Sequence, residues 1–136
     1  MSPFDKFMEK FDRNPGASDE AIRSAEAALG IIFPEDYAAF LRAANGGEGP
    51  IGEGYAAFYP VEELVDLNRD YQIDEYVPGL LLFGSSRGGE AFTFDKRTTP
   101  WPVVMVPFVG LSFEDAIVRG VSFTEFLQHL YDGGEW

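Results

Sequence analysis

The spacing of the hydrophobic residues changes along this chain, and that change is the strongest constraint on its fold. Apolar residues recur every three to four positions over residues 1–45, which is the spacing of amphipathic helices. Short apolar runs broken by glycine and proline follow, which is typical of strands. Helical spacing returns over residues 61–72 and again near the end. The order predicts an α+β fold with N-terminal helices, a central antiparallel sheet and a C-terminal closing helix.

The first predicted helix covers residues 3–13. Its apolar side chains fall at i, i+3, i+4 and i+7 and therefore share one face: Phe4, Phe7, Met8 and Phe11. Ser2 is placed to cap this helix, Pro3 suits its first position, and Asn14-Pro15-Gly16 would end it.

Two further helices are predicted over residues 18–29 and 34–44. Ser18 is a favourable N-cap for the earlier one, and Gly30 suits its C-terminal end. Pro34 suits the start of the later one, which would end at Asn45-Gly46-Gly47.

A fourth helical pattern, from Val61 to about Gln72, has two opposite sides. At about 100° per residue, one arc is apolar and the other is acidic. The apolar arc contains Val61, Leu64, Val65, Leu67 and Tyr71. The acidic arc contains Glu62, Glu63, Asp66 and Asp70.

The sheet is predicted mainly from residues 51–59, 80–95 and 102–108. The middle segment reads as a hairpin with an irregular loop. The glycine-rich stretch 46–54 is interpreted as a flexible turn between helix and strand, and Ser112–Val118 stays open between a helical turn and a strand.

The closing helix is predicted over residues 122–131, where Ser122 and Glu125 form a capping box. Seven side chains of the predicted helices and strands are expected to be buried: Phe40, Leu41, Phe83, Phe94, Phe123, Phe126 and Leu127.

Charge and composition restrict the function. The 136 residues fit a single domain, and they carry 23 acidic against 10 basic side chains, a net charge of −13. Such a chain is repelled by nucleic acid and by anionic membranes, and its one cationic region, Arg87, Lys96 and Arg97, is too small to reverse this. No signal peptide and no membrane span are recognised. We therefore expect a cytoplasmic protein that binds another, basic protein.

The residues that catalysis and metal binding require are sparse. There is no cysteine and the single histidine, His129, falls on the closing helix, so neither a nucleophilic triad nor a histidine metal site is expected. Asp66-x-Asn68-x-Asp70 copies the start of a calcium loop, but Tyr71 and Val77 occupy the positions that need glycine and glutamate. We predict no cofactor and no enzymatic activity.

Three segments, in order, resemble the SUKH superfamily, which includes the yeast cell-wall assembly regulator and many bacterial toxin-immunity proteins. The first runs from Leu29 to Leu41 and closes with Asn45-Gly46-Gly47. The second segment, residues 82–95, resembles the central hairpin of that superfamily. The third segment, residues 122–127, resembles its closing helix. Twelve residues form this structural motif: Gly30, Pro34, Tyr37, Asn45, Gly46, Gly47, Gly84, Gly88, Asp95, Ser122, Phe123 and Phe126. Ser85-Ser86-Arg87 departs from the family, in which many members carry an Asp-Gly pair.

The resemblance implies a non-enzymatic domain, whose bacterial members neutralise a cognate toxin by direct binding. Two alternatives remain: a regulatory or scaffolding adaptor without a toxin, and a small hydrolase or carbohydrate-binding domain that uses buried carboxylates. The oligomeric state stays open. Partner binding is expected on the acidic arc and on two loops, through Glu62, Glu63, Asp66, Asp70, Glu48, Glu53, Arg87 and Glu90.

Overall fold

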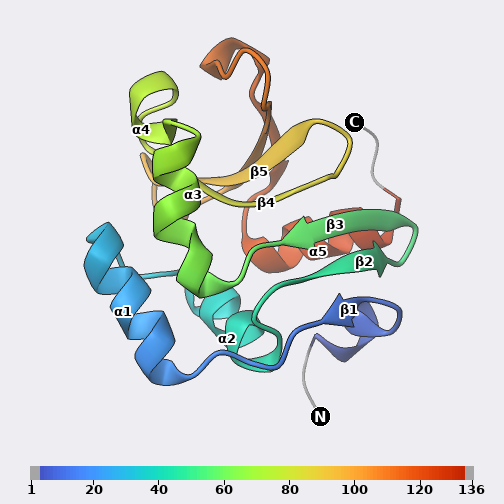
Figure 1. Cartoon of the computed structure of the whole chain (residues 1–136). Helices are drawn as coiled ribbons and strands as arrows, with labels where there is room; N and C mark the ends of the chain where they lie inside the picture. Colours follow the sequence, from blue (N-terminus) through green and yellow to red (C-terminus); the bar gives the residue numbers. More distant parts are fainter. Residues whose placement is uncertain (1–3, 134–136) are drawn as a thin grey trace.

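The computed structural model describes residues 4–133 and shows an α+β fold (Figure 1). Its described strands form one antiparallel seven-stranded sheet whose strands are neighbours in sequence order. The strands are β1 Asp12–Arg13, β2 Gly47–Ile51, β3 Gly54–Phe58, β4 Leu80–Ser85, β5 Glu90–Asp95, β6 Val103–Pro107 and β7 Ile117–Gly120. The helices are α1 Asp19–Leu29, α2 Glu35–Ala43, α3 Leu64–Asp70, α4 Ile73–Tyr76 and α5 Phe123–Tyr131, with 3-10 turns η1 Asp5–Met8, η2 Val61–Glu63 and η3 Phe113–Asp115.

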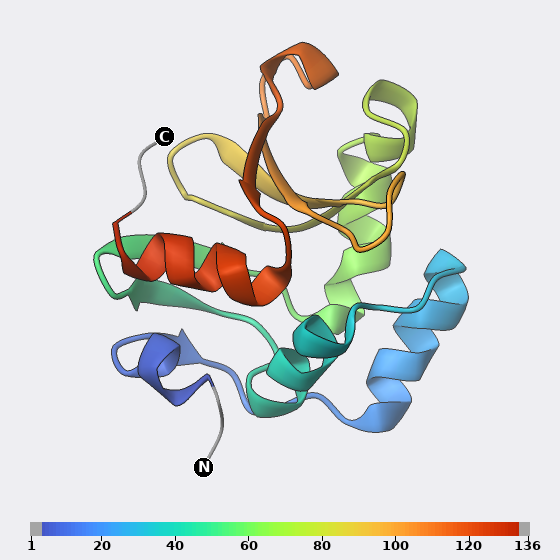
Figure 2. The same ribbon diagram turned by 180° about the vertical axis from the view of Figure 1, so that it is seen from behind.

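The central strands β4, β5 and β6 are covered on both faces. Because side chains alternate along a strand, Leu81 and Phe83 join the cluster shared with α2 and α5, whereas Leu80 and Leu82 join the one shared with α4. The two views show α3 and α5 on opposite sides of the sheet (Figures 1 and 2). This explains why the strands read as continuous apolar runs.

Aromatic rings dominate the larger cluster. Phe83 stacks on Phe94 at 4.3 Å between ring centroids, and Phe126 meets Phe92 edge-on at 4.8 Å. Tyr37 brings α2 into the same group, 5.0 Å from Phe94. All seven side chains predicted to be buried are at most 1% exposed, so that prediction is confirmed.

The prediction of a helix over residues 3–13 is wrong. The described part of this segment forms the 3-10 turn η1 and then β1, which pairs with β2 through Asp12 and Glu48. Phe4, Phe7 and Phe11 are nevertheless buried. A 3-10 turn brings residues three apart, such as Phe4 and Phe7, to one side, and Phe11, beyond the turn, contacts Phe58. Ser2 and Pro3 lie outside the described residues.

The glycine-rich stretch 46–54 is a hairpin, which corrects the prediction of a flexible turn before one strand at 51–59. β2 and β3 pair in register from Gly47 opposite Phe58 to Ile51 opposite Gly54. A Cβ on Gly47 would lie 2.4 Å from the backbone oxygen of Asp12. Glycine is therefore required here because β1 approaches closely. Its presence makes the composition of this strand resemble that of a loop.

The ends of α1 and α2 largely follow prediction. Ser18 Oγ accepts a hydrogen bond from the Ala21 amide at 3.1 Å, and Gly30 ends α1 in the left-handed region at φ 69°. Pro34 is the residue before α2 rather than its first residue, and α2 ends at Ala43, before Asn45.

The closing helix α5 carries one half of the predicted capping box. Ser122 Oγ accepts a hydrogen bond from the Glu125 amide at 3.2 Å. Glu125 in turn accepts from the amide of Val121, one residue earlier than in the standard box.

The remaining segments refine the prediction. Ser112–Val118, left open above, contains both η3 and the start of β7. The helical pattern of residues 61–72 is divided into η2 and α3, in which Leu64 is buried. Tyr71, expected on the apolar arc, is 41% exposed and contacts Phe108 at 4.9 Å between centroids.

Candidate functional site

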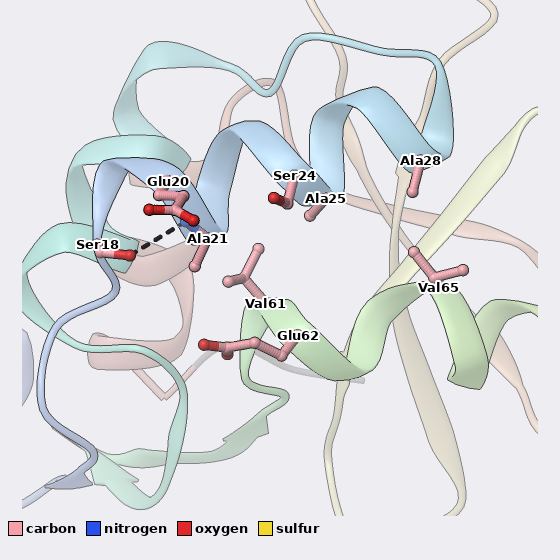
Figure 3. Close-up of a pocket in the computed structure, with 9 residues that line it drawn as sticks. All are labelled: Ser18, Glu20, Ala21, Ser24, Ala25, Ala28, Val61, Glu62 and Val65. Atoms are coloured by element: carbon pink, nitrogen blue, oxygen red, sulfur yellow. Dashed lines mark hydrogen bonds between the residues drawn. The ribbon is translucent and has the colours of Figure 1, made fainter.

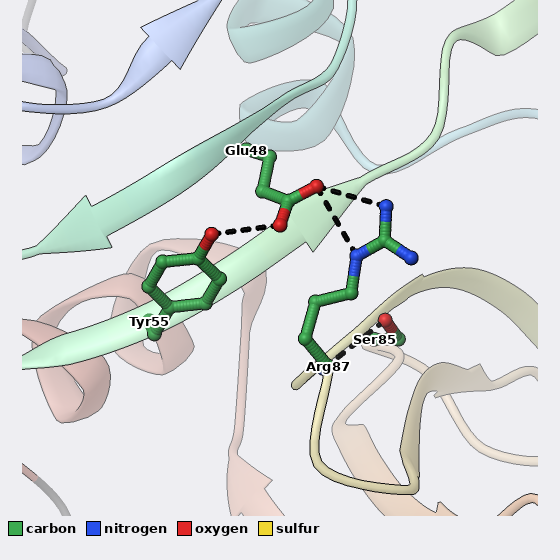
Figure 4. A network of polar contacts seen from close by, with 4 residues as sticks. All are labelled: Glu48, Tyr55, Ser85 and Arg87. Atoms are coloured by element: carbon green, nitrogen blue, oxygen red, sulfur yellow. Dashed lines mark hydrogen bonds and ion pairs between the residues drawn. The ribbon is translucent and has the colours of Figure 1, made fainter.

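The outer face of the β2–β3 hairpin carries a network of charged and polar side chains (Figure 4). Glu48 Oε1 accepts hydrogen bonds from Arg87 Nε at 3.1 Å and Arg87 Nη2 at 2.8 Å. Glu48 Oε2 accepts a hydrogen bond from the Tyr55 hydroxyl at 2.7 Å. Both carboxylate oxygens are therefore occupied, and residues from two hairpins are fixed relative to each other.

The strand register explains why these side chains meet. Glu48 lies opposite Ala57, and Ala57 lies opposite Ser85, so a row of side chains on one face leads from β2 to the end of β4. Arg87 lies just beyond β4, where its amide donates to Ser85 Oγ at 3.3 Å. The hydrogen bond from Tyr55, and then that from Arg87, lowers the pKa of Glu48.

The β4–β5 loop is held in an uncommon conformation. Arg87 has φ 65°, which is unfavourable for a residue with a long side chain. Ser86 Oγ donates to Glu90 Oε1 at 2.8 Å and accepts from the Gly88 amide at 3.0 Å. The loop thus holds Arg87 outward, with its side chain 62% exposed.

Tyr59 connects this network with α3. Its side chain is half-buried, and burial is the main cause that raises the pKa of its hydroxyl. Tyr71 and Glu63 raise that pKa further, whereas a hydrogen bond with Ser85 lowers it. Tyr59, which directly follows β3, therefore borders the network through Ser85, whose Oγ also accepts a hydrogen bond from the Arg87 amide.

The four residues of the acidic arc are all exposed, but their partners differ. Glu62 Oε1 accepts a hydrogen bond from Asn45 Nδ2 at 2.7 Å. Asp66 and Asp70 lie on either side of Arg69, at 3.0 Å and 3.7 Å from its guanidinium. Glu62 thus also has a structural role.

The structure brings together only some of the predicted binding residues. Glu48 and Arg87 are in contact, and Glu90 joins their loop through Ser86. Glu53 lies in the turn of the β2–β3 hairpin, where its amide donates to the Tyr131 oxygen at 3.0 Å. It therefore belongs to the end of the hairpin that meets α5.

Most of the motif residues that we interpreted as structural have clear contacts. Asn45 Oδ1 accepts from the Val61 amide at 2.8 Å and links the end of α2 to η2. Asp95 accepts two hydrogen bonds from the guanidinium of Arg97, both at 2.9 Å. A Cβ on Gly84 would lie 2.7 Å from the Ala57 oxygen, whereas Gly88 has no neighbour closer than 3.5 Å.

Within residues 4–133, no group of three or more His, Asp or Glu side chains is arranged to hold a metal ion. His129 lies on α5, half-buried. Among the described helices, none has both the length and the apolar character needed to cross a membrane.

Comparison with known proteins identifies the family. A family model described as the SMI1 / KNR4 family (SUKH-1) matches residues 16–129. The chain belongs to this family. No curated protein matches it. The match runs from the segment before α1 into α5, which it covers up to residue 129, and it leaves out η1 and β1.

Two important residues were missed by sequence reasoning. The sequence analysis gave Tyr55 no role of its own. Successive side chains of a strand point to opposite faces, so Tyr55 points outward where its neighbour Ala56 is buried. Asn68 was considered only as part of a calcium-like motif. Its amide instead bonds the backbone of β4 at Leu82 through both its oxygen and its nitrogen.

Proposed function

We propose that this chain is a non-enzymatic immunity protein that neutralises a toxin by binding it directly. Membership of the SMI1 / KNR4 family (SUKH-1) supports a toxin-immunity or regulatory role. The net charge of −13 suits a basic partner.

The observation that carries the proposal is the Glu48–Tyr55–Arg87 network. Its charged side chains are exposed, yet they are fixed by contacts between two hairpins. Fixing side chains before association lowers the entropy lost on binding. The strained backbone of Arg87 is also typical of residues that act in recognition.

The acidic arc supplies the electrostatic part of this proposal. Glu63, Asp66 and Asp70 are exposed on or beside α3. Complementary charge of this kind accelerates association and discriminates between partners.

The test uses the purified product of the gene next to that of this chain. Reversal of Glu63, Asp66 and Asp70 to lysine should slow its association, and the difference should shrink with added salt because exposed charges are screened over about 10 Å at 0.1 M. Glu62 is left unchanged because it bonds Asn45.

The matched control reverses Glu9, Glu114 and Asp115, which are also exposed and change the net charge equally. In addition, Arg87→Ala should weaken the complex about tenfold or more, as truncation of an interface arginine commonly does. Equal association rates for the two triple variants, together with an unchanged dissociation constant for Arg87→Ala, would exclude this surface. Lack of binding by the wild-type chain would instead favour the regulatory adaptor.

A further inference from the structure

A continuous groove runs between α1 and the η2–α3 segment, on a different side of α3 from the network. One part is a hollow of about 550 Å³ and the next is one of about 390 Å³, and the two share Ala28 and Val65 in their walls. Both volumes fall in the range of roughly 300–1,000 Å³ that is usual for ligand pockets. The eleven residues of α1 extend about 16 Å at 1.5 Å per residue.

The groove exists because α1 has small side chains on the side that faces α3. Ala21, Ala25 and Ala28 fall at helical spacing and project only a methyl group each (Figure 3). Opposite them are Val61 and Val65, the former fully buried and the latter half-buried. The same hollow is also lined by the exposed Ser18 and Ser24, so the floor is partly apolar, and it stays open because no long side chain fills it.

The rim of the groove is acidic. Glu20 and Glu62 lie at one end, and Asp74 and Glu75 lie at the other. All four are exposed. The one cation in the walls, Arg69, is already paired with Asp66 and Asp70, so the rim attracts positive charge.

The geometry also restricts the shape of the occupant. Both walls are helices, whose backbone amides and carbonyls bond within their own turns. An extended segment would find no strand edge here and would leave its own backbone groups unpaired. A helix satisfies its backbone internally and needs only an apolar face, which is the usual mode of binding in such grooves.

We propose that the α1–α3 groove binds an amphipathic helix of a partner protein, with aliphatic side chains on the floor and lysine or arginine at the acidic rim. This rests on the proposed function and adds the chemistry of the bound segment. It also gives the chain a second contact area, separate from the Glu48–Tyr55–Arg87 network.

The direct test uses a synthetic peptide of about 14 residues with leucine at helical spacing and lysine elsewhere. Its dissociation constant is measured for the wild type and for Ala28→Leu, which fills the middle of the groove. Ala27→Leu is the matched control, because Ala27 is the exposed neighbour on α1 and lines a different hollow. Leucine is a good helix former, so both variants should fold.

We expect Ala28→Leu to weaken peptide binding at least about tenfold and Ala27→Leu to change it less than about twofold. A peptide with glutamate in place of every lysine should not bind. Equal effects of the two leucine variants, or binding of the glutamate peptide as tight as that of the lysine peptide, would overturn the proposal.

A second arm separates this inference from the proposed function. The purified neighbouring gene product is tested against the same two variants. If it binds the wild type and both variants equally, the immunity function stands and the groove assignment is wrong. If it binds none of them, the immunity function is wrong, and the peptide assay still decides the groove.

Discussion

Asn68 offers the sharpest test of how the helices are attached to the sheet. Its Oδ1 accepts from the Leu82 amide at 2.8 Å, while its Nδ2 donates to the Leu82 oxygen at 3.0 Å and the Leu64 oxygen at 2.8 Å. The ladder between β3 and β4 covers only Gly84 and Ser85 of β4, and a bulge interrupts β4 between Leu82 and Gly84. The side chain of Asn68 thus makes the hydrogen bonds to the Leu82 backbone that a neighbouring strand would otherwise make.

Asn68→Ala should cost about 2–4 kcal/mol of unfolding free energy. The reason is that Leu82 is fully buried, so both its amide and its carbonyl lose their partner, at about 1–3 kcal/mol for each unsatisfied group. Some relaxation or entry of water lowers the sum. Urea unfolding followed by tryptophan fluorescence gives the difference, and hydrogen exchange of the Leu82 amide should become faster.

Two further variants sharpen the result. Asn14→Ala removes one exposed hydrogen bond to the Asn45 oxygen and should cost about 1 kcal/mol or less. Asn68→Asp keeps the acceptor but places a carboxylate against two carbonyl oxygens, so its stability should improve as the pH falls and the new carboxyl becomes protonated. A loss below about 0.5 kcal/mol for Asn68→Ala, or equal losses for Asn68→Ala and Asn14→Ala, would refute the reasoning.

The remaining predictions concern the core, a helix cap and one buried carboxylate. Phe126→Ala should lower the free energy of unfolding in urea by about 3–5 kcal/mol, because Phe126 is fully buried. A loss below about 1.5 kcal/mol would contradict the packing of its ring. Ser122→Ala should cost about 1 kcal/mol, and an unchanged midpoint would mean that the cap is not formed. The hydrogen bond from Arg97 lowers the pKa of Asp95 below its usual range, so Asp95→Asn should destabilise the protein at pH 7. That difference should disappear as the pH falls through the lowered pKa, and a constant difference would exclude the linkage.

The sequence predicted the class of fold because its longest patterns are unambiguous. The spacing over residues 18–29 and 122–131 indicates helices, and the short runs 80–83 and 91–94, separated by a glycine-rich loop, indicate a hairpin. These elements form most of the core. Their burial was therefore predictable, down to individual phenylalanines.

The N-terminal error shows the limit of periodicity in a short segment. Four apolar residues cannot distinguish a helix from a 3-10 turn followed by an extended stretch. The extended stretch forms because β1 pairs with β2, and the two strands are about 35 residues apart in sequence. Tertiary pairing of this kind leaves no local signal.

The Glu48–Tyr55–Arg87 network was predictable only in part, for a similar reason. Glu48 and Arg87 were proposed as partner-binding residues of two predicted loops. Their contact depends on the register of the β2–β3 and β3–β4 ladders, and register cannot be obtained without knowing which strands are neighbours. Asn68 was missed because its partner is backbone, which any sequence could supply.

Close packing against neighbouring backbone explains two glycines of the structural motif. A Cβ on Gly46 would lie 2.5 Å from the Phe58 oxygen, and one on Gly84 would lie 2.7 Å from the Ala57 oxygen. Since backbone cannot yield as a side chain can, any larger residue would displace a strand of the sheet. The fold therefore accounts for glycine at these two positions. Arg87, by contrast, is exposed and lies in the loop after β4, so a substitution there changes the proposed binding surface while leaving the ladders intact.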